Sequence, residues 1–397
     1  MNKTKGINKG IRTSKTLIAA MISSCLICHG ALADSGATSI KIGGYVKMDG
    51  VAINASQGDQ DGHIVDSFYV PGATPINSQA TDGSNWDSHF TAQESRFWLG
   101  ASKALENGNS LSARIELDFY SLGNTGGDER VSNSYAPRLR HAYIKYNNIL
   151  VGQTWSTFMH LHALPEGVDF APLADGRAFV RQAMVRWSPR ADITIGLENS
   201  STTITPNGGG SRILADDGEL PDVVIKWSPK VSWGSFSIAA MARQLSYNDN
   251  ALDTETAAYG VSLGSKIKVG DDDIRVGAIW GDGMGRYLGL NSGNDAVLDS
   301  NGELQTIKQI GARIAYRHLW SPKLRSTVGY SVLKSDNETS LTGTSVTASH
   351  SSYLANLMYT VESGFTVGAE YMYAERENES GATGDQSRIH FSAKYAF

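Results

Sequence analysis

Charged side chains alternate with apolar ones in several short segments of this chain, and arginines are prominent among them. In the segment 111–120, for example, Arg114, Glu116 and Asp118 occupy every second position. Because the side chains of a strand alternate between its two faces, these charged groups would share one face. Opposed acidic and basic groups on the inner face of a channel orient polar solutes, and an excess of arginine favours anions.

The candidate pore residues form two groups. The wall group lies on the early alternating segments: Arg96, Arg114, Arg138, Arg140 and Arg186, with Glu94, Glu116 and Asp118. The constriction group lies in the segment 158–177: His160, His162, Glu166, Asp169 and Arg177. Two interpretations of the arginines stay open, since they could line the solute path or pair with neighbouring carboxylates to hold the wall together. The alternation does not decide which face of their segments Arg138, Arg140 and Arg186 occupy.

The same residues offer little for metal or cofactor chemistry. His160 and His162, with Glu166 and Asp169, have ligand-type side chains, but no second motif anchors them as a zinc site requires. Both cysteines of the chain, Cys25 and Cys28, lie near its N-terminus. We therefore expect no metal site, no cofactor and no disulfide in the rest of the chain.

The first 33 residues differ in kind from the remainder. Five basic and no acidic residues are followed by an apolar run from Leu17 to Ile27, and Ala31-Leu32-Ala33 then precedes Asp34. This is the pattern of a secretory signal peptide, and the run is too short to span a bilayer as a helix. We expect residues 1–33 to be removed and 34–397 to form the mature protein.

The composition of the mature chain limits its function. With the leader removed, 30 basic and 40 acidic side chains remain, a net charge of −10, which argues against a nucleic-acid partner. No apolar stretch is long enough for a transmembrane helix. The chain nevertheless has 42 glycines, 16 tyrosines, 11 phenylalanines and 8 tryptophans, as expected of a membrane barrel with a polar lumen and an apolar outer wall.

The last ten residues show the clearest strand. Ile389, Phe391, Ala393, Tyr395 and Phe397 share one face, and polar residues mostly occupy the other. This period of two continues for about the length that crosses a bilayer at a tilt. A terminal aromatic residue resembles the signal that the outer-membrane assembly machinery recognises.

Similar alternation predicts a 16-stranded antiparallel transmembrane β-barrel, an even number as in single-chain bacterial barrels. The connections alternate between short turns and long loops rich in Gly, Asn, Asp and Ser, which predicts periplasmic turns and external loops. Trp-Ser-Pro followed by a cation, at 187–190, 227–230 and 320–323, marks three of these turns. The predicted strands are 40–54, 89–103, 109–121, 137–147, 149–157, 178–188, 192–203, 219–229, 233–247, 256–269, 272–287, 304–320, 322–335, 347–362, 364–377 and 386–397.

Motifs in the first half of the barrel region resemble the DcaP-like porins. They include Gly44-Tyr45-Val46-Lys47-Met48-Asp49, Ser95-Arg96-Phe97 and Gly152-Gln153-Thr154-Trp155-Ser156. The resemblance implies a homotrimeric channel in the outer membrane of a Gram-negative bacterium, in contact with lipid and lipopolysaccharide, that takes up dicarboxylates and similar anions. Many relatives carry a coiled coil before the barrel. Only residues 34–39 precede the first strand here, so a trimer would rest on the barrel walls.

Three functions are weighed on this basis. The first is passive uptake of small hydrophilic anions through a porin whose third loop, 158–177, folds inward and narrows the channel. The second is an outer-membrane lipase or protease, for which His141 and His390 are the candidates. The third is a non-transporting adhesin or anchor that acts through loops 55–88 and 122–136. The arginines and the loop pattern favour the porin and predict no enzymatic activity.

Overall fold

The computed structural model describes residues 37–397 apart from 59, 61–62, 77–84, 122–130 and 250. The expected signal peptide, residues 1–33, therefore lies outside the described residues, as do parts of the first two long loops. No helix within the described ranges is both long and apolar enough to cross a membrane.

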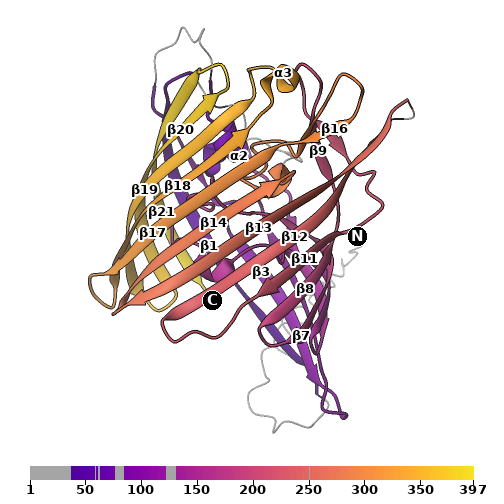
Figure 1. Cartoon of the computed structure of the whole chain (residues 1–397). Coiled ribbons are helices and arrows are strands. Elements are labelled where there is room, and N and C mark those ends of the chain that lie inside the picture. The colour runs from indigo at the N-terminus through magenta and orange to yellow at the C-terminus, as the bar shows by residue number, and fades with distance from the viewer. Residues whose placement is uncertain (1–36, 59, 61–62, 77–84, 122–130, 250) are drawn as a thin grey trace, which may run out of the picture.

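The wall is a closed antiparallel barrel, with strands that tilt around a central lumen (Figure 1). The first and last strands pair with each other and close it. Because β2 and β3 lie end to end beside β1, the 17 strands of the sheet fill sixteen positions, and the predicted fold is confirmed. The wall strands are β1 (Ser39–Ala55), β2 (Asp87–Thr91), β3 (Arg96–Ala104), β4 (Ser110–Asp118), β5 (Arg138–Tyr146), β6 (Ile149–Trp155), β7 (Arg181–Arg190), β8 (Ile193–Glu198), β11 (Asp222–Trp227), β12 (Gly234–Asn248), β13 (Asp253–Val269), β14 (Asp272–Asp282), β17 (Lys308–Leu319), β18 (Leu324–Asp336), β19 (Thr347–Glu362), β20 (Phe365–Asn378) and β21 (Thr383–Ala396).

The two rims differ as the loop lengths predicted. Short turns join β5 to β6, β13 to β14 and β19 to β20 at one rim, which we call the turn rim. The longer connections lie at the opposite rim, the loop rim, and carry the short helices of the structure. These helices are α2 (His63–Ser67), α3 (Thr339–Thr342), η1 (Pro71–Ala73) and η3 (Gly285–Tyr287), and a further one, η2 (Leu161–Ala163), lies within the third loop.

The predicted strand ends are wrong where two long loops form a sheet of their own. The predicted strands 192–203 and 272–287 end at Glu198 and Asp282, and the wall part of 304–320 begins at Lys308. Of the residues beyond these ends, 202–203 and 304–306 belong to a four-stranded sheet, and 285–287 form η3. The strands of this sheet are β9 (Thr202–Thr205), β10 (Ile213–Ala215), β15 (Ala296–Leu298) and β16 (Leu304–Thr306). Alternation cannot separate a wall strand from a loop strand, because both have the same period.

A buried arginine ties this small sheet to the wall. Arg243 of β12 forms ion pairs with Asp222 at 3.1 Å and with Asp295 at 2.8 Å. Asp295 also accepts hydrogen bonds from the backbone N–H and the hydroxyl of Thr203, at 2.8 and 3.0 Å. The guanidinium thus compensates two carboxylates that burial would otherwise make costly.

The outer face of the wall is apolar. On β21, Phe391 and Tyr395 are 58% and 54% exposed, whereas Arg388 and His390 are buried on the inner face. The two faces predicted for the last strand are therefore confirmed. Trp187, Trp227 and Trp320 also point outward near the turn rim, where tryptophan suits the boundary between lipid and water.

The third loop, residues 158–177, lies inside the barrel, and we call it L3. Its backbone N–H groups at Val168 and Asp169 donate to the Glu370 carboxylate of β20, at 2.9 and 3.2 Å. Asn356 of β19 donates to the same carboxylate and to the Glu166 carbonyl, both at 3.0 Å. The inward course predicted for this loop is thus fixed by side chains on the wall.

Glycines on the inner wall let L3 approach closely. A Cβ at Gly264 would lie 2.4 Å from the Cβ of His160, and a Cβ at Gly176 of L3 would lie 2.2 Å from the Ala312 carbonyl oxygen. No ordinary side chain fits such distances. The wall glycines that face L3 are Gly264, Gly311, Gly329 and Gly368.

Asp175 anchors the end of L3. Its carboxylate accepts hydrogen bonds from the Tyr69 hydroxyl, at 2.7 Å, and from the Ser352 hydroxyl of β19. Asp175 is fully buried, and burial raises its pKa to about 6. No cation forms an ion pair with it in the part of the chain that the structure describes.

Replacing Asp175 by asparagine is expected to remove one source of pH dependence. The pKa of Asp175 rises from about 3.9 in the unfolded chain to about 6 in the folded one. Its contribution to stability is therefore complete below about pH 4 and is lost as the pH rises through about 6. Between pH 4 and pH 8, unfolding in urea should lose up to about 3 kcal/mol more in the wild type than in Asp175→Asn.

The exposed Asp216 offers a matched control, since Asp216→Asn changes the same charge on the loop rim. This variant should keep the pH dependence of the wild type. If the curves of Asp175→Asn and the wild type run parallel from pH 4 to pH 8, the buried carboxylate does not titrate as described.

Candidate pore constriction

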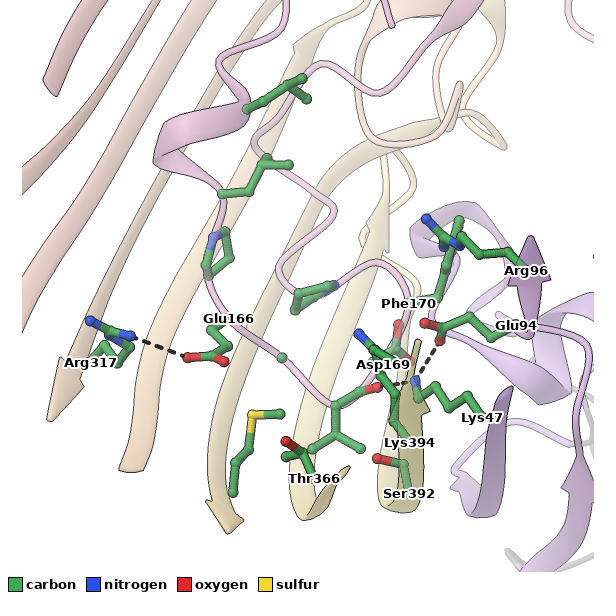
Figure 2. Close-up of a pocket in the computed structure, with 18 of the residues that line it drawn as sticks. Lys47, Glu94, Arg96, Glu166, Asp169, Phe170, Arg317, Thr366, Ser392 and Lys394 are labelled. Carbon is green, nitrogen blue, oxygen red and sulfur yellow. Dashed lines mark hydrogen bonds and ion pairs between the residues drawn. The ribbon is translucent and has the colours of Figure 1, made fainter. Parts of the chain in front are cut away.

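A cavity of about 720 Å³ lies between L3 and the inner wall (Figure 2). Its lining includes Gly364 and Ala396, so it reaches the turn rim. Cations outnumber carboxylates in its lining. The cations are Lys47, Arg96, Arg140, Arg177, Arg275, Arg317, Arg325 and Lys394, and the carboxylates are Glu94, Glu166 and Asp169. An anion inside it would meet eight cations and three carboxylates.

Four arginines on one side of the lumen share two carboxylates. The ion pairs are Arg96–Glu116 at 3.6 Å, Arg114–Glu116 at 2.6 Å, Arg138–Asp118 at 2.8 Å, Arg140–Glu116 at 2.9 Å and Arg140–Asp118 at 2.6 Å. The sequence placed these six residues in the wall group, and the structure brings them together. The pairing holds β3, β4 and β5 to one another and leaves two positive charges in excess. Of the six, only Arg96 and Arg140 line the cavity.

A β-bulge explains why the face of β5 was ambiguous. The register between β4 and β5 shifts between Glu116 and Leu117, so that His141 lies opposite Glu116 and Leu139 opposite Leu117. Arg140 is the extra residue, and it points inward like its neighbour His141. A bulge re-aims side chains in this way, and simple alternation does not foresee it.

Glu94 belongs to a separate group beside L3. It pairs with Lys47 of β1 at 2.5 Å and accepts a hydrogen bond from the Tyr45 hydroxyl at 3.0 Å. Lys47 also pairs with Asp49 at 3.1 Å and donates to the Val168 carbonyl of L3 at 2.7 Å. Figure 2 shows Lys47 between Glu94 and L3, so this lysine links the wall to the loop.

Asp169 joins the same side of L3 to the last strand. It accepts a hydrogen bond from the Tyr69 N–H at 2.9 Å and lies 3.8 Å from the His390 ring. Burial alone would raise the pKa of Asp169, but the neighbouring His390 ring lowers it to about 2. The Asp169 carboxylate therefore stays charged in the lumen and fixes L3.

Glu166 of L3 pairs with arginines that the sequence analysis did not single out. It lies 2.8 Å from Arg325 of β18 and 3.7 Å from Arg317 of β17, on the opposite side of the cavity from Lys47 and Arg96 (Figure 2). Arg317 and Arg275 also pair with Asp273, at 2.7 and 2.6 Å. These three arginines lie on late strands. From the sequence, only their positions in the alternation, on the side that faces inward, could have indicated a place in the pore.

The remaining candidates have other surroundings. His160 bonds to Ser237 and Ser262, at 2.5 and 2.9 Å, and burial lowers its pKa to about 2, so it anchors L3 as a neutral ring. Arg177 lines the cavity and donates to the Pro172 carbonyl at 3.1 Å. His162 and Arg186 lie outside this cavity and line a second one.

The arrangement gives no sign of metal or hydrolytic chemistry in the described ranges. No group of three or more His, Cys, Asp or Glu residues there is placed to hold a metal ion. His141 bonds to the Thr154 hydroxyl at 3.0 Å, and His390 lies 2.8 Å from Asp49, so both hydrolase candidates take part in wall contacts. The lining of the cavity is predominantly basic.

Similar structures share this architecture. The outer membrane channel DcaP of Acinetobacter baumannii aligns with a TM-score of 0.73 and 23% identity, over 93% of this chain and 99% of that one. The anion-selective porin from Comamonas acidovorans aligns with a TM-score of 0.56 and 10% identity, over 91% of this chain and 100% of that one. OmpT of Vibrio cholerae aligns with a TM-score of 0.55 and 10% identity, over 92% of this chain and 99% of that one. At such identities these likenesses support the fold.

The family follows from the sequence itself. Among curated proteins, no significant match is found. The sequence profile of the DcaP outer membrane protein family matches residues 2–397, so the chain belongs to this family of non-enzymatic channels of the Gram-negative outer membrane.

Proposed function

We propose that the protein is a passive diffusion channel for small hydrophilic anions of the carboxylate type. The observation that supports this is the excess of cations in the constriction, where eight cations and three carboxylates line the cavity. A low-dielectric wall strengthens the field of such an excess.

The pairing of the cations favours passage over tight binding. Arg317 and Arg325 share the Glu166 carboxylate, and Arg96 and Arg140 share Glu116. These two basic groups lie on opposite sides of the cavity (Figure 2), an arrangement in which each could face one carboxylate of a dicarboxylate solute. Lys394 and Arg177 form no ion pair within the described residues, and they supply the least compensated charge. A related fold in Comamonas is named as an anion-selective porin, in line with this proposal.

We further propose that the protein is a homotrimer in contact with outer-membrane lipid and lipopolysaccharide. The apolar outer face, with Phe391, Tyr395 and Trp320 exposed, suits lipid or a neighbouring barrel. One of the similar structures, OmpT of Vibrio cholerae, is described in a trimer form. The trimer contacts would then lie on the barrel walls.

Planar-bilayer recordings test the selectivity. In a KCl gradient the reversal potential should show a preference for chloride. Lys394→Gln should lower the chloride-to-potassium permeability ratio by roughly a factor of two or more, because it removes an uncompensated charge from the constriction. A clear preference of the wild type for potassium would refute the anionic function.

Lys103→Gln is the matched control for this measurement. Lys103 is exposed near the end of β3 and does not line the cavity, so its replacement should leave the permeability ratio unchanged. An equal loss in both variants would assign the selectivity to general surface charge.

The trimer predicts conductance in groups of three. Each insertion into the bilayer should produce one large step that closes in three equal sub-steps, and chemical cross-linking in detergent should stop at the trimer. Single steps together with a monomeric mass in detergent would exclude it.

The expected signal peptide, residues 1–33, predicts the N-terminus of the mature protein. N-terminal sequencing of the protein recovered from outer membranes should begin at Asp34, because cleavage is expected after Ala31-Leu32-Ala33. Recovery of the chain with residues 1–33 attached would contradict this processing.

A further inference from the structure

A second cavity, of about 500 Å³, lies between the base of L3 and the inner wall of β5 to β8 and β11. Trp155 and Leu161 line both this cavity and the constriction, so they separate the two. Asn148, Ser188 and Ser228 also line it, and they lie next to short turns. The second cavity therefore opens toward the turn rim, beside the constriction.

The charges of this cavity have one sign. Lys145, Arg186 and Lys226 line it, and no Asp or Glu appears in its described lining. Unlike the arginines of β3 to β5, these three cations form no ion pair with the described residues. Glu198 of β8 lies on the inner face beside the cavity without lining it; it is 1% exposed and accepts from the Thr157 N–H at 2.6 Å. A net positive charge thus faces the cavity.

Two of the cations are fixed in place by hydrogen bonds to L3 and to the residues that come just before it. Arg186 donates through Nε to the Thr157 hydroxyl at 2.9 Å, and through Nη2 to the Trp155 carbonyl. Lys226 donates to the Met159 carbonyl. These acceptors are neutral, so the positive charges stay available to a ligand. The Lys145 side chain forms no hydrogen bond or ion pair with the described residues and is exposed.

Hydroxyl groups supply the remaining polar contacts. Six Ser and Thr side chains line the cavity: Thr154, Ser156, Thr157, Ser188, Thr194 and Ser228. A hydroxyl is neutral and can donate one hydrogen bond to an anion. Several separated cations with several hydroxyls suit a tetrahedral dianion, which presents three charged oxygens in different directions.

We propose that this second cavity binds a phosphate group, either inorganic phosphate or the phosphate of a small organic monoester, from the turn rim. Its volume is within the range of small-ligand sites. The site is separate from the constriction, and the proposal does not require that the channel prefer anions.

Calorimetric titration of the purified full chain in detergent at low salt tests the site with inorganic phosphate. We expect saturable binding that is about tenfold weaker in Lys145→Gln and absent in Lys145→Glu. Lys145 is suited to the test because its replacement breaks no contact with L3. No saturable binding to the wild type, or unchanged binding in Lys145→Gln, would overturn the proposal.

Two controls place the ligand. Lys230→Gln removes the same charge from an exposed position on the same rim, and Lys394→Gln removes it from the constriction; both should bind phosphate like the wild type. Loss of phosphate binding in Lys230→Gln would indicate attraction by general surface charge. Loss of binding in Lys394→Gln would indicate that phosphate binds in the constriction. Either result would overturn the proposed site. A channel that prefers potassium but retains Lys145-dependent phosphate binding would refute only the proposed transport function.

Comparison ligands define the chemistry. Glycerol phosphate should bind in a Lys145-dependent manner if the natural ligand is a monoester, whereas binding of inorganic phosphate alone would indicate the free ion. Succinate should bind at least about tenfold more weakly, since its carboxylates are planar and carry less charge each. Equal affinity for succinate would contradict a phosphate site.

Discussion

The position of L3 depends on hydrogen bonds from its own backbone to a carboxylate on the barrel wall. Glu370 accepts the N–H groups of Val168 and Asp169, and without it these donors would be buried unsatisfied, at about 1–3 kcal/mol each. The lumen glycines, such as Gly264, make this close docking possible. Because L3 crosses the lumen, its position decides which wall residues face solute and how the space below it is divided.

Charge compensation explains why so many arginines can occupy the lumen. Each of Glu116 and Asp118 serves at least two guanidinium groups, and removing one carboxylate would leave several like charges adjacent. Breaking a buried pair of this kind costs about 3–5 kcal/mol. The two interpretations of these arginines are therefore compatible: pairing holds the wall together, and the remaining positive excess is the charge that the proposed anion channel would present to a solute.

The sequence predicted the structure correctly where the alternation of apolar and polar residues follows the two faces of a strand. The barrel, its closing strand and the inward faces of Arg96 and Arg114 follow from alternation and loop length. Arg140 could not be placed in this way, since a bulge on β5 changes the phase. Arg317 and Arg325 were missed because their importance depends on Glu166, which is 151 and 159 residues earlier, and only the folded chain brings them within 4 Å. The loop sheet was missed because its strands share the period of the wall.

The glycines of the inner wall were an unused signal. Gly264, Gly311, Gly329 and Gly368 all lie on the inner phase of their strands, where a side chain would normally fill the lumen. Such positions on nearby strands of one side of the wall mark the path of a segment that crosses the barrel.

That path also gives the two cavities below L3 different physical properties. On the constriction side, most cations are paired, so the proposed channel would present a moderate field to a solute, which could leave as readily as it enters, as conduction requires. On the other side, Arg186 and Lys226 donate to neutral groups, so their charge is less compensated and an anion would be held more tightly. One loop thus separates a region suited to passage from a region suited to retention, within a single barrel.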